Sequence, residues 1–278
     1  MPAEGTLARE GTIESADGTK LSYRAWPRSG AEVSFAVVHG LGDHARRYER
    51  FALGMARHGY ATFAVDLRGH GKSAGRRGHV DRWSQWTDDA AAFVAHVEGI
   101  AGGEVVPVGH SFGGAVMLST VLDKKLTNAR RFIVSSPALR LKAHVPGWKV
   151  ALAKLSSMIV PKLTLDNEVD AKTLSRIPEV VDAYRTDPLV HNKISSRLYA
   201  EWVAACGRIF QHAAEIKIPF LILAGTDDRL IDPEGSRELH RLTPSVSRLR
   251  LLEGRYHEPF NDLDNEEVFA VIADWLSA

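Results

Sequence analysis

The chain has 278 residues, of which 45% are hydrophobic and 25% charged, so it has enough apolar side chains for a sizeable core and global disorder is excluded. Thirty-five Lys and Arg against 34 Asp and Glu leave a formal charge of +1, which is too weak a field to indicate nucleic-acid binding. The single cysteine, Cys206, excludes an intrachain disulfide and a cysteine-rich metal site. The chain has no signal-peptide pattern and no apolar run of about eighteen residues, which predicts a soluble, cytoplasmic protein.

Short apolar runs alternate along the chain with longer segments of helical pattern. Residues 12–15 and 20–26 predict a β-hairpin. Continuous apolar runs predict buried strands at 33–38, 60–67, 105–108, 131–135 and 219–224, and an alternating run predicts a strand nearer the sheet edge at 248–252. Helices are expected at about 44–58, 83–100, 112–125, 233–243 and 265–277. This order predicts an α/β fold with a mostly parallel sheet and helices on both faces.

The alternation breaks once, between residues 138 and 215. This stretch is helix-like, is interrupted by prolines and contains no convincing buried strand. We therefore expect residues 1–137 and 216–278 to form one core domain and residues 138–215 to form an inserted helical cap. Such a cap would lie over the carboxyl ends of the strands, where open α/β sheets bind their ligands.

The sequence Gly-His-Ser-Phe-Gly at 109–113 directly follows one predicted strand and opens a helical segment. It matches G-x-S-x-G, in which a strained turn between strand and helix exposes the serine hydroxyl. Gly109 and Gly113 leave space around Ser111, and the helix N-terminus directs partial positive charge at the site. The pattern predicts a nucleophilic serine. The alternative is a glycine-rich turn with a helix-capping serine.

A serine nucleophile needs a base, and the base needs an orienting acid; in the hydrolase fold they follow in the order Ser, Asp or Glu, His. His257, in the loop after the last predicted strand, is the candidate base. Asp227 and Asp228 both follow the preceding strand, and spacing alone does not separate them. Asp232 is a third option for the acid, although its place before Pro233 is typical of a helix N-cap.

An oxyanion hole needs two backbone N–H donors beside the nucleophile. One candidate is the N–H of Phe112, the residue after the serine. The second should come from the loop that follows an earlier strand. The strand 33–38 leads into His39-Gly40-Leu41-Gly42, where we select the N–H of Leu41.

Longer strings resemble the α/β-hydrolase superfamily and, within it, the monoacylglycerol lipase and lysophospholipase group, which is related to the serine aminopeptidase-like hydrolases. The matching strings span nearly the whole chain and lie at 39–48 (HGLGDHARRY), 66–73 (DLRGHGKS), 187–191 (DPLVH), 225–230 (GTDDRL) and 256–258 (YHE). The resemblance implies that Ser111 is the nucleophile, His257 the base and Asp228 the acid. It also implies that Leu41 and Phe112 donate to the oxyanion.

The same resemblance implies a serine ester hydrolase without a cofactor, a monoacylglycerol lipase that releases a fatty acid and glycerol through an acyl-enzyme. A lysophospholipase or a general carboxylesterase of this fold is the alternative. Asp43 and Arg47 match positions near the alcohol side of the pocket in this group. Phe112 stands where methionine is more usual, and its larger ring is expected to reshape the acyl pocket.

The predicted cap carries a second indication of a lipid substrate. Residues 138–163 contain five basic residues and no acidic one. Within this stretch Trp148, Leu152, Leu155 and Ile159 recur at helical spacing. A basic amphipathic helix suits peripheral contact with an anionic membrane. The alternative is that this face packs under the cap or lines the acyl tunnel.

Two other classes of protein are alternatives. Residues 40–45 fit G-x-G-x-x-A after a strand, with Asp66 ending the next strand, which would indicate a nucleotide-dependent oxidoreductase. That interpretation leaves Ser111 and His257 unexplained and puts the charge of Asp43 where a pyrophosphate would approach. A non-catalytic ligand-binding protein of the hydrolase fold is the other. No metal-binding spacing occurs, and no feature of the sequence indicates an oligomeric state.

Overall fold

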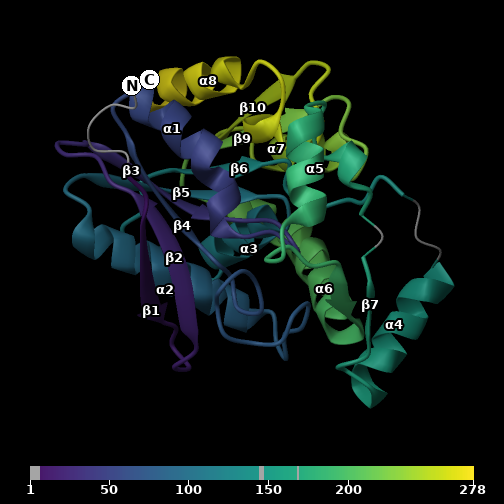
Figure 1. Cartoon of the computed structure of the whole chain (residues 1–278). Coiled ribbons are helices and arrows are strands. Elements are labelled where there is room, and N and C mark those ends of the chain that lie inside the picture. The colour runs from purple at the N-terminus through teal and green to yellow at the C-terminus, as the bar shows by residue number, and fades with distance from the viewer. Residues whose placement is uncertain (1–6, 144–146, 168) are drawn as a thin grey trace.

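An eight-stranded sheet runs through the protein, with helices on both of its faces (Figure 1). The computed structural model describes residues 7–143, 147–167 and 169–278, with the backbone alone at 148–150. In spatial order the strands are β1 (Arg9–Glu14), β2 (Lys20–Trp26), β4 (Ala61–Val65), β3 (Val33–Val38), β5 (Glu104–His110), β6 (Phe132–Ser135), β9 (Phe220–Gly225) and β10 (Ser247–Leu252). The pairs β1–β2 and β2–β4 are antiparallel, and all others are parallel. The predicted α/β fold with a mostly parallel sheet is confirmed.

The two faces of the sheet carry separate apolar layers. Side chains alternate along β3: Phe35 and Val37 belong to one layer, Ala36 and Val38 to the other. The first layer is covered by α1 (Glu49–Arg57) and α8 (Asn265–Ser277), which follow the short 3₁₀ helices η1 (Ala45–Tyr48) and η4 (Pro259–Asn261). The second is covered by α2 (Ser84–Ile100), α3 (Phe112–Leu122), α6 (Ser196–His212) and α7 (Pro233–Leu242). A strand buried on both faces needs apolar residues at nearly every position, and in β3 only Ser34 is polar.

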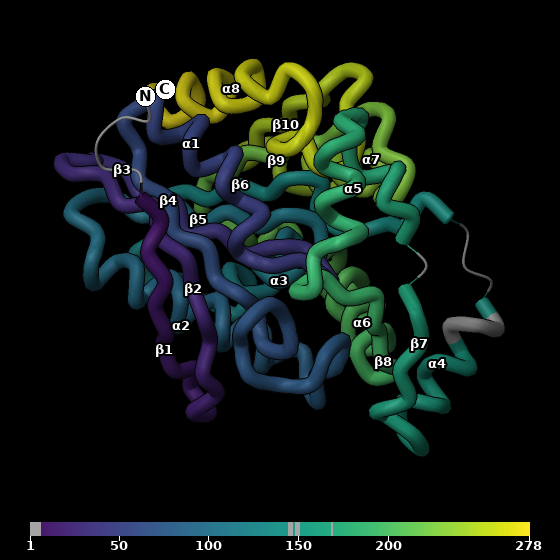
Figure 2. The backbone as a smooth tube through the Cα atoms, viewed as in Figure 1, coloured from purple at the N-terminus to yellow at the C-terminus, as the bar shows by residue number. Residues whose placement is uncertain are grey.

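Residues 138–215, which we call the cap segment, add no strand to the main sheet among their described residues. Besides α6 they form α4 (Gly147–Ile159), β7 (Thr164–Asp166), η2 (Ala171–Thr173), α5 (Pro178–Thr186), β8 (Lys193–Ser195) and η3 (Ala213–Glu215). The antiparallel pair β7–β8 was not predicted, because strands of three residues with a single apolar side chain each carry no apolar pattern. In Figures 1 and 2, α4 lies at the periphery, beside α6.

The strand order brings the loops of the predicted site to one edge of the sheet. The chain leaves β3 for β4 on one side and later enters β5 on the other, which is the switch point where α/β sheets bind ligands. Val38 at the end of β3 pairs with Gly109 in β5, and Leu252 at the end of β10 pairs with Gly225 at the end of β9. The loops that follow these strands therefore leave the sheet side by side.

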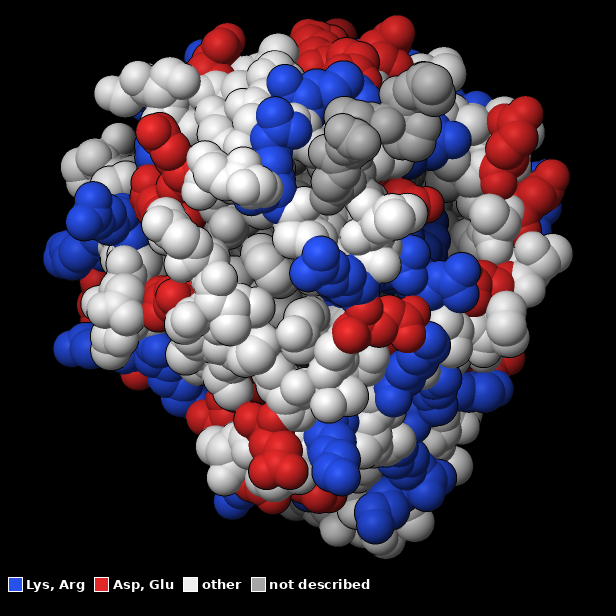
Figure 3. Space-filling model, turned by 60° about the vertical axis from the view of Figure 1, so that its left-hand side comes forward, with Lys and Arg blue, Asp and Glu red and all other residues white. Residues whose placement is uncertain are grey.

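Basic and acidic residues are nearly equal in number, and both occur on the surface (Figure 3). Basic and acidic side chains are interspersed over the face drawn in Figure 3, with basic residues more numerous toward its lower right. In the described part of the chain, no helix combines the length and hydrophobicity needed to cross a membrane.

Candidate active site

Ser111 occupies a strained turn between β5 and α3. Its φ of 54° and ψ of −119° are unfavourable for a residue with a Cβ, as expected at a nucleophile elbow. The turn closes tightly, because a Cβ on Gly113 would collide with the carbonyl oxygens of Val38 and His39. The Ser111 side chain makes no capping hydrogen bond to the helix, so the alternative of a capping serine is wrong.

The hydroxyl of Ser111 is hydrogen-bonded to His257, and His257 to Asp228. Ser111 Oγ lies 2.8 Å from His257 Nε2, and His257 Nδ1 lies 2.7 Å from Asp228 Oδ2. With Nδ1–H donating to the carboxylate, Nε2 is free to accept the hydroxyl proton. His257 and Asp228 are both buried, at 4% and 3% exposed. Three residues from distant parts of the chain thus form one hydrogen-bonded set.

Local backbone geometry separates the three acidic candidates. Asp228 Oδ1 accepts hydrogen bonds from the N–H groups of Leu230 and Ile231, which orients its carboxylate. Asp227 is exposed. Asp232 accepts from the N–H of Glu234 and caps α7, so the expectation of an N-cap is confirmed.

His257 reaches Asp228 because its loop passes close over the end of β9. A Cβ on Gly225 would collide with the carbonyl oxygens of Arg255 and Tyr256. Glycine at the last position of β9 therefore lets the histidine loop approach the acid.

Electrostatics in the set follow from burial and from the close pair. Burial lowers the pKa of His257, but the charge and hydrogen bond of Asp228, together with the charges of Glu258 and Asp43, raise it above the ordinary histidine value. Burial raises the pKa of Asp228, while the His257 charge and hydrogen bonds lower it below its usual range. Each partner thus favours the charged form of the other.

The loop after β3 lies against the nucleophile. A Cβ on Gly40 would stand 3.2 Å from Ser111 Cβ. His39 holds the loop, since its Nδ1–H donates to Gly40 O at 2.6 Å and its Nε2 accepts from Leu67 N–H at 2.9 Å. Among the described residues, the backbone N–H groups of Leu41 and Phe112 have no protein acceptor. Both residues line the cavity above Ser111.

The ring of Phe112 packs into an aromatic cluster. Three tryptophan rings lie edge-on to it: Trp83 at the N-cap of α2, Trp86 in α2 and Trp202 in α6, with centroids 5.3, 4.9 and 5.8 Å away. Phe112 is 1% exposed. The residue after the nucleophile therefore also attaches the cap segment to the core, through Trp202.

A buried charged cluster lies beside His257. Arg47 makes two hydrogen bonds of 2.7 Å to Glu258 and one of 3.1 Å to Asp43, and its guanidinium stacks 4.8 Å over the Tyr184 ring. Burial raises the pKa of both carboxyls, but the charge of Arg47, together with nearby histidines, lowers each pKa below its usual range. Asp43 and Glu258 line the cavity, whereas Arg47 lies behind them.

Glu258 and Tyr184 were not among the predicted site residues. Glu258 directly follows His257, but nothing local marks it as buried, because its partner Arg47 lies 211 residues earlier in the chain. The signal that could have found it is a charged residue in a loop that otherwise buries its side chains, which requires a partner of opposite charge.

The cavity above Ser111, which we call the reaction cavity, has a volume of about 690 Å³. One end is polar and includes Asp43, Tyr184 and Glu258. The rest of its lining is largely apolar and includes Leu152, Leu163, Leu165, Leu174 and Ile194 from the cap segment. A few polar side chains are interspersed there, namely Ser156, Asp166, Asn167, Ser195, Ser196 and Arg229. Ser111 and His257 lie in the wall of this space. Its size is in the range of small-molecule sites, and its lining suits a long apolar group joined to a small polar one.

The acid of the dinucleotide interpretation is engaged by the fold itself. Asp66, the acid of the dinucleotide interpretation, accepts hydrogen bonds from the N–H groups of Ala45 and Lys72. In the described ranges, no group of three or more His, Cys, Asp or Glu side chains is placed to hold a metal ion.

A parallel α/β sheet with a serine elbow, and a histidine and an acid after its later strands, defines the α/β-hydrolase class. The family described as "Serine aminopeptidase, S33" matches residues 31–264. The chain belongs to this family of serine hydrolases.

Similar proteins are named as lipases. The chain is 30% identical over 275 residues to a monoacylglycerol lipase of Mycolicibacterium smegmatis, covering 96% of each protein. It is 31% identical over 271 residues to human monoglyceride lipase, covering 95% of this chain and 89% of that protein. The structure of the Paleococcus ferrophilus monoacylglycerol lipase matches with a TM-score of 0.80 at 32% identity, covering 97% of this chain and 98% of that chain. The chain spans only 28% of an uncharacterized abhydrolase domain-containing protein of Dictyostelium discoideum, to which it is 32% identical. The family match and these similarities show that the chain is a serine ester hydrolase that resembles monoacylglycerol lipases.

The pair His257–Asp228 predicts a measurable titration. Wild-type His257 should titrate above the ordinary histidine value, and in Asp228→Asn its pKa should fall by at least about one unit, because the charge that offsets burial is lost. Imidazole ¹⁵N chemical shifts followed against pH measure both values. The control is Asp227→Asn, which removes an exposed carboxylate one residue away and should leave the His257 midpoint near that of the wild type. Identical midpoints in Asp228→Asn and the wild type would contradict the coupling.

Proposed function

We propose that the protein is a monoacylglycerol lipase, which hydrolyses the ester of a medium or long acyl chain with glycerol. The observation that carries the proposal is the hydrogen-bonded set Ser111–His257–Asp228 in the wall of an apolar cavity with one polar end. The similarity to monoacylglycerol lipases over nearly the full chain supports the same substrate class.

In the proposed mechanism Ser111 Oγ attacks the ester carbonyl while His257 Nε2 takes its proton. Asp228 keeps the imidazole in the required tautomer and stabilises the imidazolium. The N–H groups of Leu41 and Phe112 bind the oxyanion, each stabilising the transition state by about 3 kcal/mol. His257 then protonates the departing glycerol, and a water activated by His257 hydrolyses the acyl-enzyme. The nearby carboxylates of Asp43 and Glu258 also favour the imidazolium.

The polar end of the reaction cavity favours a neutral alcohol. The cluster of Asp43, Arg47 and Glu258 contains two carboxylates and one guanidinium, so its net charge is −1. Arg47 is engaged by both carboxylates and does not reach the cavity surface. A phosphate on the alcohol would meet Asp43 and Glu258, whereas glycerol hydroxyls can donate to them. This argument favours monoacylglycerol over phosphorylated lysolipids.

We place peripheral membrane contact on the cap segment. Three side chains at the end of α4 are exposed, Leu155 at 49% and Met158 and Ile159 at 70% each. Lys154 and Lys162 are exposed near them. Leu152 of the same helix lines the reaction cavity. For Leu152 this supports the alternative that the apolar face of the helix lines the acyl tunnel. The side chains of Trp148 and Lys149 lie outside the described residues.

In this proposal residues 138–215 act as the cap, which brings a lipid surface next to the reaction cavity. The cap segment supplies most of the apolar side chains in the cavity wall, which supports this role. The division into core (1–137 and 216–278) and cap, and the cytoplasmic location, stay predictions.

Replacing the nucleophile should abolish turnover without unfolding the protein. In Ser111→Ala we expect kcat for a monoacylglycerol to fall by at least about 10³-fold, because the hydroxyl that is hydrogen-bonded to the base His257 is lost. Thermal unfolding should be nearly unchanged, since alanine retains the strained φ and loses no capping bond. Asp228→Asn should be severe and Asp227→Asn mild in the same assay. A Ser111→Ala protein that keeps more than about a tenth of wild-type kcat would remove Ser111 from this role.

The charge of the polar end predicts a preference between two substrates that differ in one group. 1-Oleoylglycerol should have a kcat/KM at least about tenfold higher than 1-oleoylglycerol 3-phosphate, because the phosphate faces two buried carboxylates. Both substrates share one acyl chain, so a difference reports the alcohol end. Equal or reversed values would contradict the assignment of a neutral alcohol.

The exposed end of α4 predicts binding to lipid vesicles. Wild-type protein should sediment with vesicles of phosphatidylcholine and phosphatidylglycerol more than with phosphatidylcholine alone, and Ile159→Glu should weaken binding at least about tenfold. Ile100→Glu is the matched control, since Ile100 is 53% exposed at the end of α2. Equal loss in both variants, or none in Ile159→Glu, would contradict the placement on α4.

A further inference from the structure

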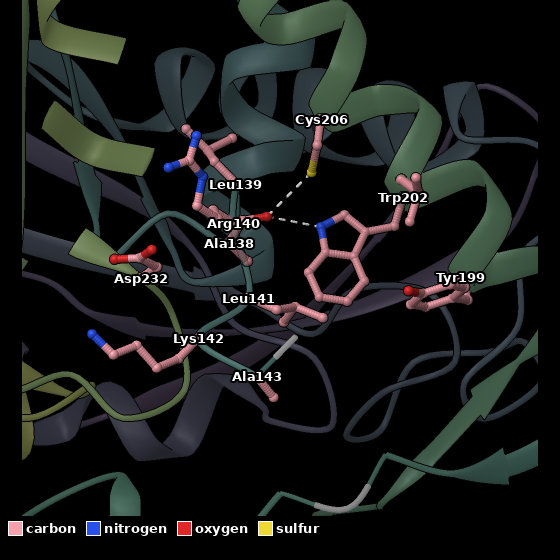
Figure 4. A pocket seen from close by; sticks show the side chains of 11 residues that line it. Ala138, Leu139, Arg140, Leu141, Lys142, Ala143, Tyr199, Trp202, Cys206 and Asp232 are labelled. Carbon is pink, nitrogen blue, oxygen red and sulfur yellow. Dashed lines mark hydrogen bonds between the residues drawn. The ribbon is translucent and has the colours of Figure 1, made fainter. Parts of the chain in front are cut away.

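A second cavity of about 470 Å³ lies next to the reaction cavity, and we call it the side cavity (Figure 4). Residues 138–143, which follow β6, form one of its walls. Its other wall is one face of α6, with Tyr199, Trp202, Val203 and Cys206 at helical spacing. Its volume is within the range of sites that bind small molecules.

The two cavities share a partition. Ala138, Leu141, Ala143, Tyr199 and Trp202 line both of them. The Trp202 ring is fixed in place, because its Nε1–H donates to the carbonyl oxygen of Ala138 at 2.8 Å and its face is packed near Phe112. The side cavity therefore adjoins the reaction cavity across mostly apolar side chains.

The side cavity has one apolar and one charged end. Figure 4 shows Tyr199, Trp202 and Leu141 on one side, and the heads of Arg140, Lys142 and Asp232 on the other. The sulfur of Cys206 lies in the apolar part, where its S–H donates to Ala138 O. Burial raises the pKa of this thiol to about 12, so it stays protonated and acts as a small apolar group.

Among the charged groups, Lys142 is the available cation. Arg140 is paired with Glu238 at 2.6 Å, and Asp232 accepts from the N–H of Glu234 at the start of α7. Within the described part of the chain Lys142 makes no ion pair, and its backbone N–H donates to Leu230 O. An ammonium at the mouth of an apolar groove can bind one anionic head while the groove takes a hydrocarbon tail.

We propose that the side cavity is a binding site for a free fatty acid, with the carboxylate at Lys142 and the chain along α6 against Trp202. The positive charge and the apolar lining of the site both match this ligand. The shared partition puts the site next to the space in which, in the proposed function, a fatty acid is released. Occupancy would press on Leu141 and Trp202 and thereby narrow the reaction cavity from behind, so the product would oppose the next turnover.

Binding is tested with dodecanoate below its micelle concentration, by calorimetry on the full chain after Ser111 has been blocked with a long-chain fluorophosphonate. The phosphonyl chain occupies the reaction cavity, so any remaining saturable site lies elsewhere. We expect one equivalent of dodecanoate to bind, and 1-dodecanol, which lacks the charge, to bind at least about tenfold more weakly. No saturable binding, or equal affinity for acid and alcohol, would overturn the proposal.

Two variants locate the site. Val203 lines the side cavity and not the reaction cavity, so Val203→Trp fills the former alone. It should weaken dodecanoate binding at least about tenfold, because the indole takes the volume of the chain. Lys142→Glu should weaken dodecanoate binding to a similar extent, because it reverses the charge that binds the carboxylate. Lys217→Glu makes the same change at an exposed lysine and should leave dodecanoate binding unchanged. Circular dichroism and thermal unfolding establish that each variant is folded.

Wild-type affinity in both Val203→Trp and Lys142→Glu would overturn the site. The result is separable from the proposed function, because the readout is binding and not turnover. A chain that fails to react with the fluorophosphonate but loses dodecanoate binding in Val203→Trp would contradict the role of Ser111 and support the side cavity.

Discussion

The close approach of backbone segments at the carboxyl edge of the sheet is the constraint on which the site depends. The register that pairs Val38 with Gly109 brings the loop after β3 beside the elbow, and Gly113 lets the elbow close against it. The register that pairs Leu252 with Gly225 does the same for the histidine and acid loops. A Cβ at Gly113 or at Gly225 would push a backbone carbonyl away. It would thereby separate side chains that must lie within about 3 Å of one another. The sheet register therefore brings the three loops together, and the side chains form their hydrogen bonds because of that approach.

The buried charges around His257 follow from the same packing. A buried carboxylate is costly unless it is paired, and the site buries three in a small volume: Asp43, Asp228 and Glu258. Arg47 compensates two of them, and Asp228 is compensated by the imidazole and two backbone N–H groups. The remaining negative potential favours a positive charge on His257. His257 is in this imidazolium form after it has taken the proton of Ser111. The buried carboxylates therefore stabilise the charge that His257 acquires during the reaction.

Much of this arrangement could be predicted from the sequence because the strongest signals are local. Continuous apolar runs marked the buried strands, and the order Ser111, Asp228, His257 matched the hydrolase fold. What could not be predicted depends on contacts between distant residues. Spacing did not separate Asp227 from Asp228, because the choice is made by how the turn after β9 buries one carboxylate. Glu258 could not be predicted because its partner is far away in the chain. The pair β7–β8 could not be predicted because strands of three residues are too short to show a period.

The cap segment divides its tasks between two helices. Trp202 in α6 is bound to Ala138 and packed near Phe112, so α6 is held to the residue after the nucleophile. The described contacts of α4 are mainly with α6, and its outer end exposes apolar side chains. A displacement of α4 can therefore change access to the reaction cavity without moving the elbow, whereas a displacement of Trp202 would be felt at Phe112. A lipid surface would then act through α4 and change the entry of substrate. A ligand in the side cavity would act through Trp202 and change the shape of the reaction cavity.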